Sequence, residues 1–422
     1  MSDSEDTDGS GVVEWPVSKE WLENILKIYH SSGTEGGEGE SPKVTVEDFE
    51  VSPGCVSGES VLSDILAVAV DYTLDGEEVK LKVIVKLLPQ DPFSRFFVTE
   101  AQFDLREIKF YTQVVPDLKA FQEKQLSASS LPGFELPIPS CIHAHYKPAG
   151  GTEETPEPPE SFLILENLRP RGYEGAEFSR GLTLRQAEAA LSAIARLHAL
   201  SLCLKVKEGR PLSEKYQFLF QTARATDSYQ QLVERGLPQL ARFLERRPGS
   251  EAVLEALLAL RPKTKEIIAS LLAPEDPLAL ITHTDFWCNN LLFKDLDDEC
   301  KCAILDWQMV TYSRPTNDIA LLLVSSVPTE LRRLHTAALL DKYWQTLLES
   351  SLPLGVDVPE DLKYSREDLD KDYRRSQLLA LLLCIGSVDV ALGDPLTEQR
   401  LIDLLEDLHT DGVLSLETAN VA

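Results

Sequence analysis

The sequence predicts an α+β protein of two lobes. The N-terminal lobe, residues 1–165, is built on an antiparallel sheet, and the larger C-terminal lobe, residues 166–422, is mostly helical. Three observations predict this. The chain of 422 residues exceeds the usual domain length two- to threefold. Runs rich in β-branched residues gather before residue 90, and amphipathic helical patterns dominate after Leu168.

The N-terminal lobe is expected to begin with a helix and continue with strands. Trp15 to Tyr29 has apolar residues at helical spacing and precedes a Gly/Ser/Glu-rich connection. Asp75-Gly76 is a strong hairpin signal between two apolar runs. An antiparallel sheet follows from three strand-like segments, which are Val44 to Val51, Ser60 to Tyr72 and Val79 to Leu87.

The last of these strands places a row of lysines on one face. The odd positions from Val79 to Leu87 are apolar, so Lys80, Lys82 and Lys86 share the opposite face. We expect that face to meet something polar. The following segment, Thr99 to Val115, has helical spacing and carries Glu107 on its apolar stripe.

The chain then returns to the sheet and becomes helical. An exposed insertion from Lys147 to Glu160 leads into an apolar strand, Ser161 to Leu165. Thr183 and Gln186 resemble a capping box that opens a helix to about Leu204. Further amphipathic helices are expected at Tyr229 to Arg246, Ser250 to Leu260 and Lys263 to Leu272.

The charge and composition of the chain indicate which classes of partner it is expected to lack and where in the cell it is expected to lie. The formal net charge of −28 would repel nucleic acid and anionic membrane surfaces, so we expect neither as a partner. Seven scattered cysteines indicate reduced thiols, and the acidic first residues are unlike a targeting peptide, so a cytoplasmic location is expected. Cys288, Cys300 and Cys302 lack the paired spacing of a structural zinc site. The sequence makes no prediction of oligomeric state.

A polar segment between short apolar strands carries the candidate chemistry. Phosphoryl transfer needs an oriented hydroxyl, a proton acceptor and divalent cations that neutralise the phosphates. Kinases meet these needs with an Asp, an Asn five residues later and a second Asp on a later loop. Asp285, Asn290 and Asp306 repeat that order and spacing, which predicts an ATP- and Mg²⁺-dependent phosphotransferase.

The wider pattern resembles a known family. His283-x-Asp285-x-Trp287-x-x-Asn290, followed by Asp306-Trp307-Gln308, is similar to the ecdysteroid kinase-like family. That family lies within the aminoglycoside phosphotransferase and choline kinase superfamily of protein-kinase-like fold. Similar motifs in the same order include Val85-Lys86-Leu87-Leu88-Pro89, Leu165-Glu166-Asn167-Leu168 and Leu197-His198-Ala199.

The resemblance implies roles for individual residues. Asp285 would orient the acceptor hydroxyl or take its proton, while Asn290 and Asp306 would hold Mg²⁺. Lys86 would grip the α- and β-phosphates of ATP, in preference to Lys80 or Lys82. Glu107 would pair with Lys86, which explains a carboxylate on an apolar stripe, because a buried carboxylate needs a partner.

The resemblance also implies a nucleotide site and reveals two departures. The loop at Ser57 and Gly58 would cover the phosphates, and the segment from Glu166 to Leu168 would meet adenine. The family usually has Gly at Thr284 and Phe at Trp307. A β-branched residue resists the backbone angles open to Gly, so the catalytic loop is expected either to shift or to avoid positive φ.

Other polar residues are expected to support the fold and not to act in catalysis or metal binding. His198 lies on the apolar face of its helix and is expected to be a hydrogen-bonded core histidine. His283 is expected to support the loop around Asp285, and Asp318 to brace it. His143 and His145 share a face of a short strand but lack the carboxylate of a metal site.

Three functions remain open at this stage. The first is a kinase that transfers the γ-phosphoryl group of ATP to a hydroxyl of a small molecule, such as a steroid alcohol. The second is a nucleotide-binding pseudokinase that regulates a partner, suggested by Thr284 and the single Gly58. The third is a kinase for choline or another amino alcohol, which would suit the acidic chain.

Overall fold

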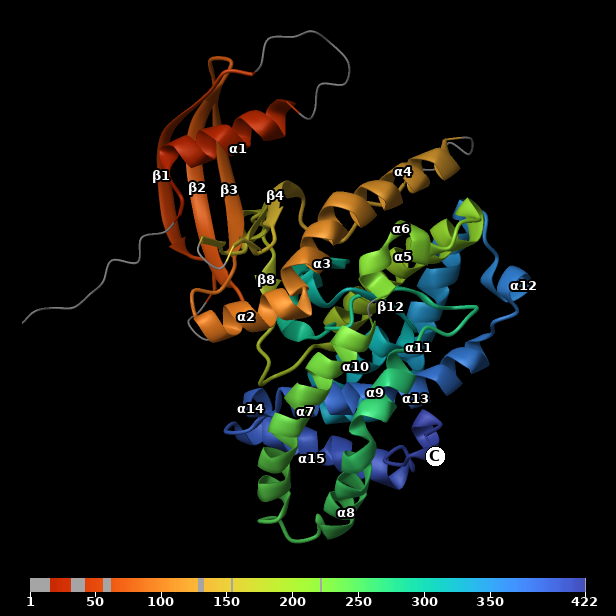
Figure 1. Ribbon diagram of the computed structural model, residues 1–422. Coiled ribbons are helices and arrows are strands. Elements are labelled where there is room, and N and C mark those ends of the chain that lie inside the picture. Colours follow the sequence, from red (N-terminus) through yellow and green to blue (C-terminus); the bar gives the residue numbers. More distant parts are fainter. Residues whose placement is uncertain are drawn as a thin grey trace, which may run out of the picture.

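The fold places an N-terminal sheet beside a large helical body (Figure 1). A computed structural model of the chain describes residues 16–31, 42–55, 62–127, 133–152, 155–220 and 222–421. The sheet and helix α1 lie at the upper left of the view, helices α2 to α4 run beside the sheet, and the helices from α5 onward form most of the remaining molecule. The predicted α+β fold class is confirmed.

A five-stranded antiparallel sheet forms the N-terminal part. Its strand order is β1-β2-β3-β7-β4. The predicted hairpin between β2 and β3 is present, and its turn residues Asp75 and Gly76 have φ of 51° and 93°. The strands are β1 (Val44–Pro53), β2 (Asp64–Leu74), β3 (Glu77–Leu87), β4 (Cys141–Lys147) and β7 (Glu160–Glu166). The small hairpin of β5 (Gly150–Gly151) and β6 (Pro156–Glu157) sits in the predicted exposed insertion.

The two faces of the sheet have different partners. Helix α1 (Lys19–Ser31) buries Leu22, Ile25 and Leu26 against one face, where Val83 and Val85 of β3 also lie. Side chains alternate along a strand, so Lys86 points to the other face. On that face lie the helices that follow β3.

The segment after β3 forms several consecutive helices, where the sequence periodicity predicts a single helix. It forms α2 (Pro92–Ala101), α3 (Phe103–Lys109), a π-helical turn (Phe110–Val114) and α4 (Val115–Leu126). The predicted single helix from Thr99 to Val115 was therefore wrong in its bounds. The break falls at Gln102, which takes a left-handed φ of 58° between α2 and α3. Gln102 carries no local sequence signal for that turn.

The helical body has one long central helix. Helix α5 (Leu184–Glu208) opens with the predicted capping box of Thr183 and Gln186. By length and composition it could cross a membrane, yet 72% of its apolar window is buried inside the protein, as in a core helix. Other helices are α6 (Leu212–Lys215), α7 (Thr222–Leu244), α8 (Glu251–Leu260), α9 (Thr264–Leu272), α10 (Thr316–Ser326), α11 (Thr329–Ser351), α12 (Val358–Leu362), α13 (Arg366–Gly386), α14 (Val388–Ala391) and α15 (Pro395–Thr410).

Short strands carry the polar segment predicted to be catalytic. Strands β9 (Leu280–Thr282) and β12 (Thr311–Ser313) pair with each other. Strands β10 (Leu291–Asp295) and β11 (Cys300–Ile304) form a hairpin, and β8 (Glu174–Gly175) pairs with β10. The loops β9–β10 and β11–β12 therefore leave neighbouring strands, and they hold Asp285 and Asp306.

Candidate active site

A buried ion-pair cluster joins the sheet to the helical body. Lys86 of β3 donates to Glu107 Oε2 of α3 and to Asp306 Oδ1, each at 2.6 Å. The Lys86 and Glu107 side chains are 13% and 4% exposed. Burial alone would lower the pKa of Lys86, but the carboxylates of Asp306 and Glu107 outweigh it and raise that pKa. Lys86 is therefore a cation held at a fixed point.

The other lysines of the row are placed differently. Lys80 is 79% exposed and pairs with Asp71 on the neighbouring strand β2. Lys82 is also exposed. Of the three lysines on this face of β3, Lys86 alone contacts residues of the candidate site.

A histidine fixes the backbone around Asp285. The Asp285 N–H lies 3.2 Å from His283 Nδ1, and His283 Nε2 lies 2.8 Å from the carbonyl oxygen of Leu305. These contacts fit a neutral ring that accepts at Nδ1 and donates at Nε2. His283 thus links the loop that carries Asp285 to the loop that carries Asp306, as expected of a supporting residue.

Asp318 of helix α10 holds the loop that carries Asp285. Its carboxylate, fully buried on α10, accepts the backbone N–H of His283 at 2.8 Å and of Thr284 at 2.7 Å. His198 of α5 contacts the same carboxylate at 3.1 Å and Tyr343 at 2.9 Å. The predictions for Asp318 as a brace and for His198 as a hydrogen-bonded core histidine agree with these contacts.

Thr284 adopts a left-handed backbone angle that favours glycine. Its φ is +68°, and its side chain is buried. The left-handed region costs an L-residue about 1–2 kcal/mol. Thr282 Oγ1, at 3.0 Å from Thr284 Oγ1, and the bond to Asp318 hold it there. The loop does not avoid positive φ, because the surrounding contacts hold threonine at this angle.

Asp285 is hydrogen-bonded to Asn290, and its pKa is raised. Asn290 Nδ2 donates to Asp285 Oδ2 and to its carbonyl oxygen, both at 2.8 Å. Burial and the nearby Asp306 carboxylate raise the pKa of Asp285 to about 6. Although the side chain is partly exposed to a pocket, the surrounding protein atoms still exclude most water from it. A carboxylate with a pKa near 6 suits a proton acceptor that works at neutral pH.

Asn290 and Asp306 offer oxygen atoms that fit Mg²⁺. Because Asn290 donates through Nδ2, its Oδ1 faces away from Asp285, and no hydrogen bond to that oxygen occurs within the described residues. Asp306 Oδ1 accepts a hydrogen bond from Lys86, which leaves Asp306 Oδ2 available to a metal ion. Mg²⁺ binds through one or two protein oxygens together with phosphates and water. No cluster of three or more His, Cys, Asp or Glu that could hold a metal occurs in the same described part of the chain.

The residue after Asp306 packs against the ion-pair helix. Trp307 stacks on Phe110 with ring centroids 4.0 Å apart and an angle of 8°. Its backbone N–H donates to Glu107 Oε1 at 3.2 Å. Asp306 itself has φ of 59°. The second departure from the family, Trp307 in place of Phe, is thus accommodated by stacking.

An apolar pocket opens beside Asp285. It has about 630 Å³ of empty space, and this volume includes space that is open to solvent. Two of its described lining residues are charged, Asp285 and Arg400. The walls come mainly from α10, α13, α14 and α15, and include Phe178, Trp287, Leu321, Val324, Leu383, Cys384, Val390, Leu401 and Leu404.

Sequence reasoning missed most of this pocket. Phe178, Cys384 and Arg400 were not considered as site residues. A signal existed for Arg400, because Thr397, Arg400, Leu401 and Leu404 follow the spacing of a buried helix face. A basic residue on such a stripe indicates a special environment.

The remaining predicted nucleotide residues are placed as follows. Ser57 and Gly58 lie outside the described residues. Glu166 ends β7, and its side chain pairs with Arg171 at 3.0 Å. Leu168 is buried, and its carbonyl oxygen accepts the N–H of Arg171 and of Tyr173. The chain passes from the sheet to the helical body here, and the adenine site stays a prediction.

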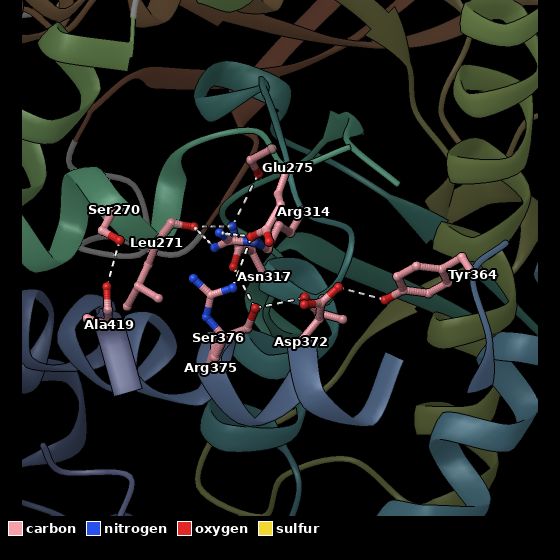
Figure 2. A network of polar contacts seen from close by, with 12 residues as sticks. Ser270, Leu271, Glu275, Arg314, Asn317, Tyr364, Asp372, Arg375, Ser376 and Ala419 are labelled. Carbon is pink, nitrogen blue, oxygen red and sulfur yellow. Dashed lines mark hydrogen bonds and ion pairs between the residues drawn. The ribbon is translucent and has the colours of Figure 1, made fainter. Parts of the chain in front are cut away.

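A polar network fixes the helices behind the catalytic loop (Figure 2). Arg314 donates to Glu275 and to the Leu271 carbonyl, and Arg375 of α13 contacts the same Glu275 oxygen at 3.0 Å. Ser376 of α13 donates to Asn317 Oδ1 at 2.8 Å. Asn317 precedes Asp318, so these bonds tie the helix that braces the loop to the helix that supplies a pocket wall.

Solved structures with similar chains were compared. Choline kinase from Cryptosporidium parvum Iowa II has 13% identity and a TM-score of 0.45, over 95% of this chain and 99% of that one. Plasmodium vivax ethanolamine kinase has 11% identity and a TM-score of 0.39, over 91% and 87%. A putative aminoglycoside phosphotransferase from Ralstonia eutropha JMP134 has 15% identity and a TM-score of 0.33, over 94% and 98%.

These structural likenesses are too weak to carry an argument about activity. A comparison with curated proteins gave no significant match. The family comparison is stronger, because the match covers residues 57–356 and includes the ion-pair cluster, the catalytic loop and Asp306. On this match the chain belongs to the ecdysteroid kinase-like family.

Proposed function

We propose that this protein transfers the γ-phosphoryl group of ATP to a hydroxyl group of an apolar small molecule, such as a steroid alcohol. Family membership supports a kinase that acts on a small molecule. The observation that carries the proposal is the position of Asp285. It lines the apolar pocket, and it is close enough to Asp306 of the Lys86 cluster for that carboxylate to raise its pKa.

The residues supply the functions that phosphoryl transfer needs. An acceptor in the pocket would present its hydroxyl to Asp285, which takes the proton as the oxygen attacks the γ-phosphorus and the bond from that phosphorus to the departing ADP breaks. Lys86 would hold the nucleotide phosphates, with Glu107 fixing its ammonium. Asn290 and Asp306 would hold Mg²⁺, which neutralises charge on the phosphates when bound. His283 and Asp318 keep Asp285 in position throughout.

The pocket does not favour the choline alternative. A quaternary ammonium ligand is usually held by aromatic faces and carboxylates. The described lining does contain aromatic rings and the carboxylate of Asp285, but it also places the guanidinium of Arg400 in the same space, which would repel a cationic acceptor. The pseudokinase alternative rests on Thr284 and the single Gly58. Thr284 holds a φ of +68°, and Gly58 lies outside the described residues.

The test is acceptor-dependent turnover of ATP. The protein is incubated with Mg²⁺, ATP and a panel of steroid alcohols, amino alcohols and sugars, and the phosphorylated product is identified by mass spectrometry. We expect phosphorylation of apolar alcohols that needs Mg²⁺. Nucleotide binding without transfer to any acceptor would support the pseudokinase, and transfer to choline alone would refute the apolar acceptor.

A further inference from the structure

One charged group in the apolar pocket has no role in the proposed chemistry. Arg400 of α15 lines the pocket and is 7% exposed, and that exposure faces the pocket. No acidic side chain among the residues that the structure describes forms an ion pair with it. A buried charge without a counter-ion is unfavourable and rare, so its presence beside a ligand cavity needs a reason.

The protein groups around Arg400 hold it without neutralising it. Its Nη2 donates to the carbonyl oxygen of Phe178 at 2.8 Å, and its guanidinium carbon lies 4.7 Å from the Phe178 ring centre. Gly181 makes room, since a Cβ there would lie 2.9 Å from Arg400 Nη1. These contacts orient the planar guanidinium and use one of its five N–H donors.

Two nearby thiols do not supply a negative charge. Cys288 and Cys384 are close enough to affect Arg400, but burial raises the pKa of Cys384 to about 12 and also raises that of Cys288, so both stay neutral thiols. Asp394 is a nearby carboxylate whose charge favours the charged form of Arg400, yet no ion pair joins these two described side chains, and Asp394 Oδ1 accepts the N–H groups of Leu396 and Thr397 as the cap of α15.

Two of the other polar side chains in the lining are already hydrogen-bonded. Ser325 Oγ donates to the Leu321 carbonyl at 2.6 Å, and Thr397 Oγ1 donates to the Ala391 carbonyl at 2.6 Å. The pocket therefore combines apolar walls with two charged groups of opposite sign. Asp285 would bind the reacting hydroxyl of the acceptor. The guanidinium of Arg400 remains available to bind another group of the acceptor.

We infer that the acceptor bears an oxyanion, such as a carboxylate, on its apolar body, and that Arg400 binds this group. Arg presents a planar fork that matches the two oxygens of a carboxylate. A pocket of low polarity strengthens this pairing. The inference rests on the proposed function only in taking this pocket as the acceptor site. Arg400 is then the residue that determines specificity, and hydroxylated apolar acids are preferred over neutral alcohols.

Binding measurements on a matched pair of probes test this inference. Cholic acid and its methyl ester share hydroxyls and ring system and differ in the anion, and both can be used below the micelle concentration. Quenching of the fluorescence of Trp287 in the pocket wall, or calorimetry, gives affinity without any turnover. We expect the acid to bind at least about tenfold more tightly than the ester, which corresponds to about 1.4 kcal/mol.

Two variants separate recognition from packing. Arg400→Met keeps an unbranched apolar stem without the charge and should remove the preference for the acid, while Arg400→Lys should keep part of it. Arg332→Met is the control, because Arg332 is also buried but pairs with Asp407 at 2.7 Å away from the pocket. Equal affinity of wild type for acid and ester, or a preference that survives in Arg400→Met, would overturn the inference. Selective binding of the acid without phosphorylation would instead contradict the proposed function.

Discussion

Two residues of the catalytic segment, Thr284 and Asp306, have left-handed backbone although neither is glycine. Each lies where a strand gives way to a loop that carries a functional carboxylate. Strain of this kind persists only where surrounding contacts impose it. Asp318, which accepts the N–H of Thr284, supplies such a contact at the first position.

Thr284 can be replaced by glycine with little change. Thr284→Gly should relieve about 1–2 kcal/mol of backbone strain and lose a similar amount through unfolded-chain entropy and the hydroxyl contact. We expect a free energy of unfolding within about 1 kcal/mol of wild type and retained turnover. Thr284→Val keeps the strain and loses the bond to Thr282, so it should be less stable by about 1–3 kcal/mol. Denaturant titration checks both, and a rise in activity of more than tenfold in the glycine variant would show that threonine impairs the loop.

Asp285 should make stability depend on pH. Its pKa rises from 3.8 in the unfolded chain to about 6 in the fold, so the folded state binds the proton more tightly. The ionised side chain therefore destabilises the fold. This loss of stability is absent below pH ~4, grows between pH ~4 and ~6, and is complete above pH ~6. Asp285→Asn should raise the free energy of unfolding by about 1–3 kcal/mol at pH 7 and change it little at pH 4.

This prediction is checked by denaturant titration in metal-free buffer at both pH values. Asp298→Asn serves as the control, because Asp298 lies on an exposed loop near the same strands. A loss of stability at pH 7 in Asp285→Asn would show that Asp285 forms favourable contacts as an anion. The proposed function requires this residue despite its cost.

At the scale of elements, strand β3 and helix α3 are joined by the Lys86–Glu107 pair. Lys86→Met leaves two carboxylates, Glu107 and Asp306, facing each other at a buried site, which should cost about 3–5 kcal/mol. Adding Glu107→Gln should restore part of that loss, whereas Lys80→Met should change stability by less than about 1 kcal/mol. Unfolding of the single and double variants measures the coupling. Additive losses would mean that the pair does not join the two elements.

The elements that could be predicted are those with local signals. Strand β3 alternates along its length, Asp75-Gly76 forms the expected turn, and Thr183 with Gln186 caps α5. The break at Gln102 could not be predicted, since a left-handed Gln arises from packing and not from a local preference. The same holds for Thr284, whose φ is imposed by contacts with distant Asp318.

At the scale of the whole molecule, the candidate site unites residues from distant parts of the chain. Lys86 and Asp306 are separated by 220 residues and meet at 2.6 Å. Their convergence could be expected from the order of motifs and the family resemblance. The acceptor pocket could not, because its walls come from α10, α13, α14 and α15, whose apolar residues look alike whether they face a core or a cavity.

Nucleotide binding should stabilise the molecule through this convergence. ATP and Mg²⁺ at about 100 times the dissociation constant should add about 2.7 kcal/mol to the free energy of unfolding. The resulting thermal shift should vanish in Lys86→Met and Asp306→Asn and persist in Asp285→Asn. Calorimetric melting with and without ATP checks this, and a full shift in Asp306→Asn would remove that residue from the nucleotide and metal site.

The most direct test of the account is transfer of the γ-phosphoryl group to the best apolar alcohol of the panel, measured with radiolabelled ATP. Wild type and Asp298→Asn should form labelled product at similar rates. Asp285→Asn should bind ATP as wild type does yet lose at least about 100-fold in rate, the usual scale of general-base catalysis. Product formation by Asp285→Asn at a rate near wild type would contradict the account.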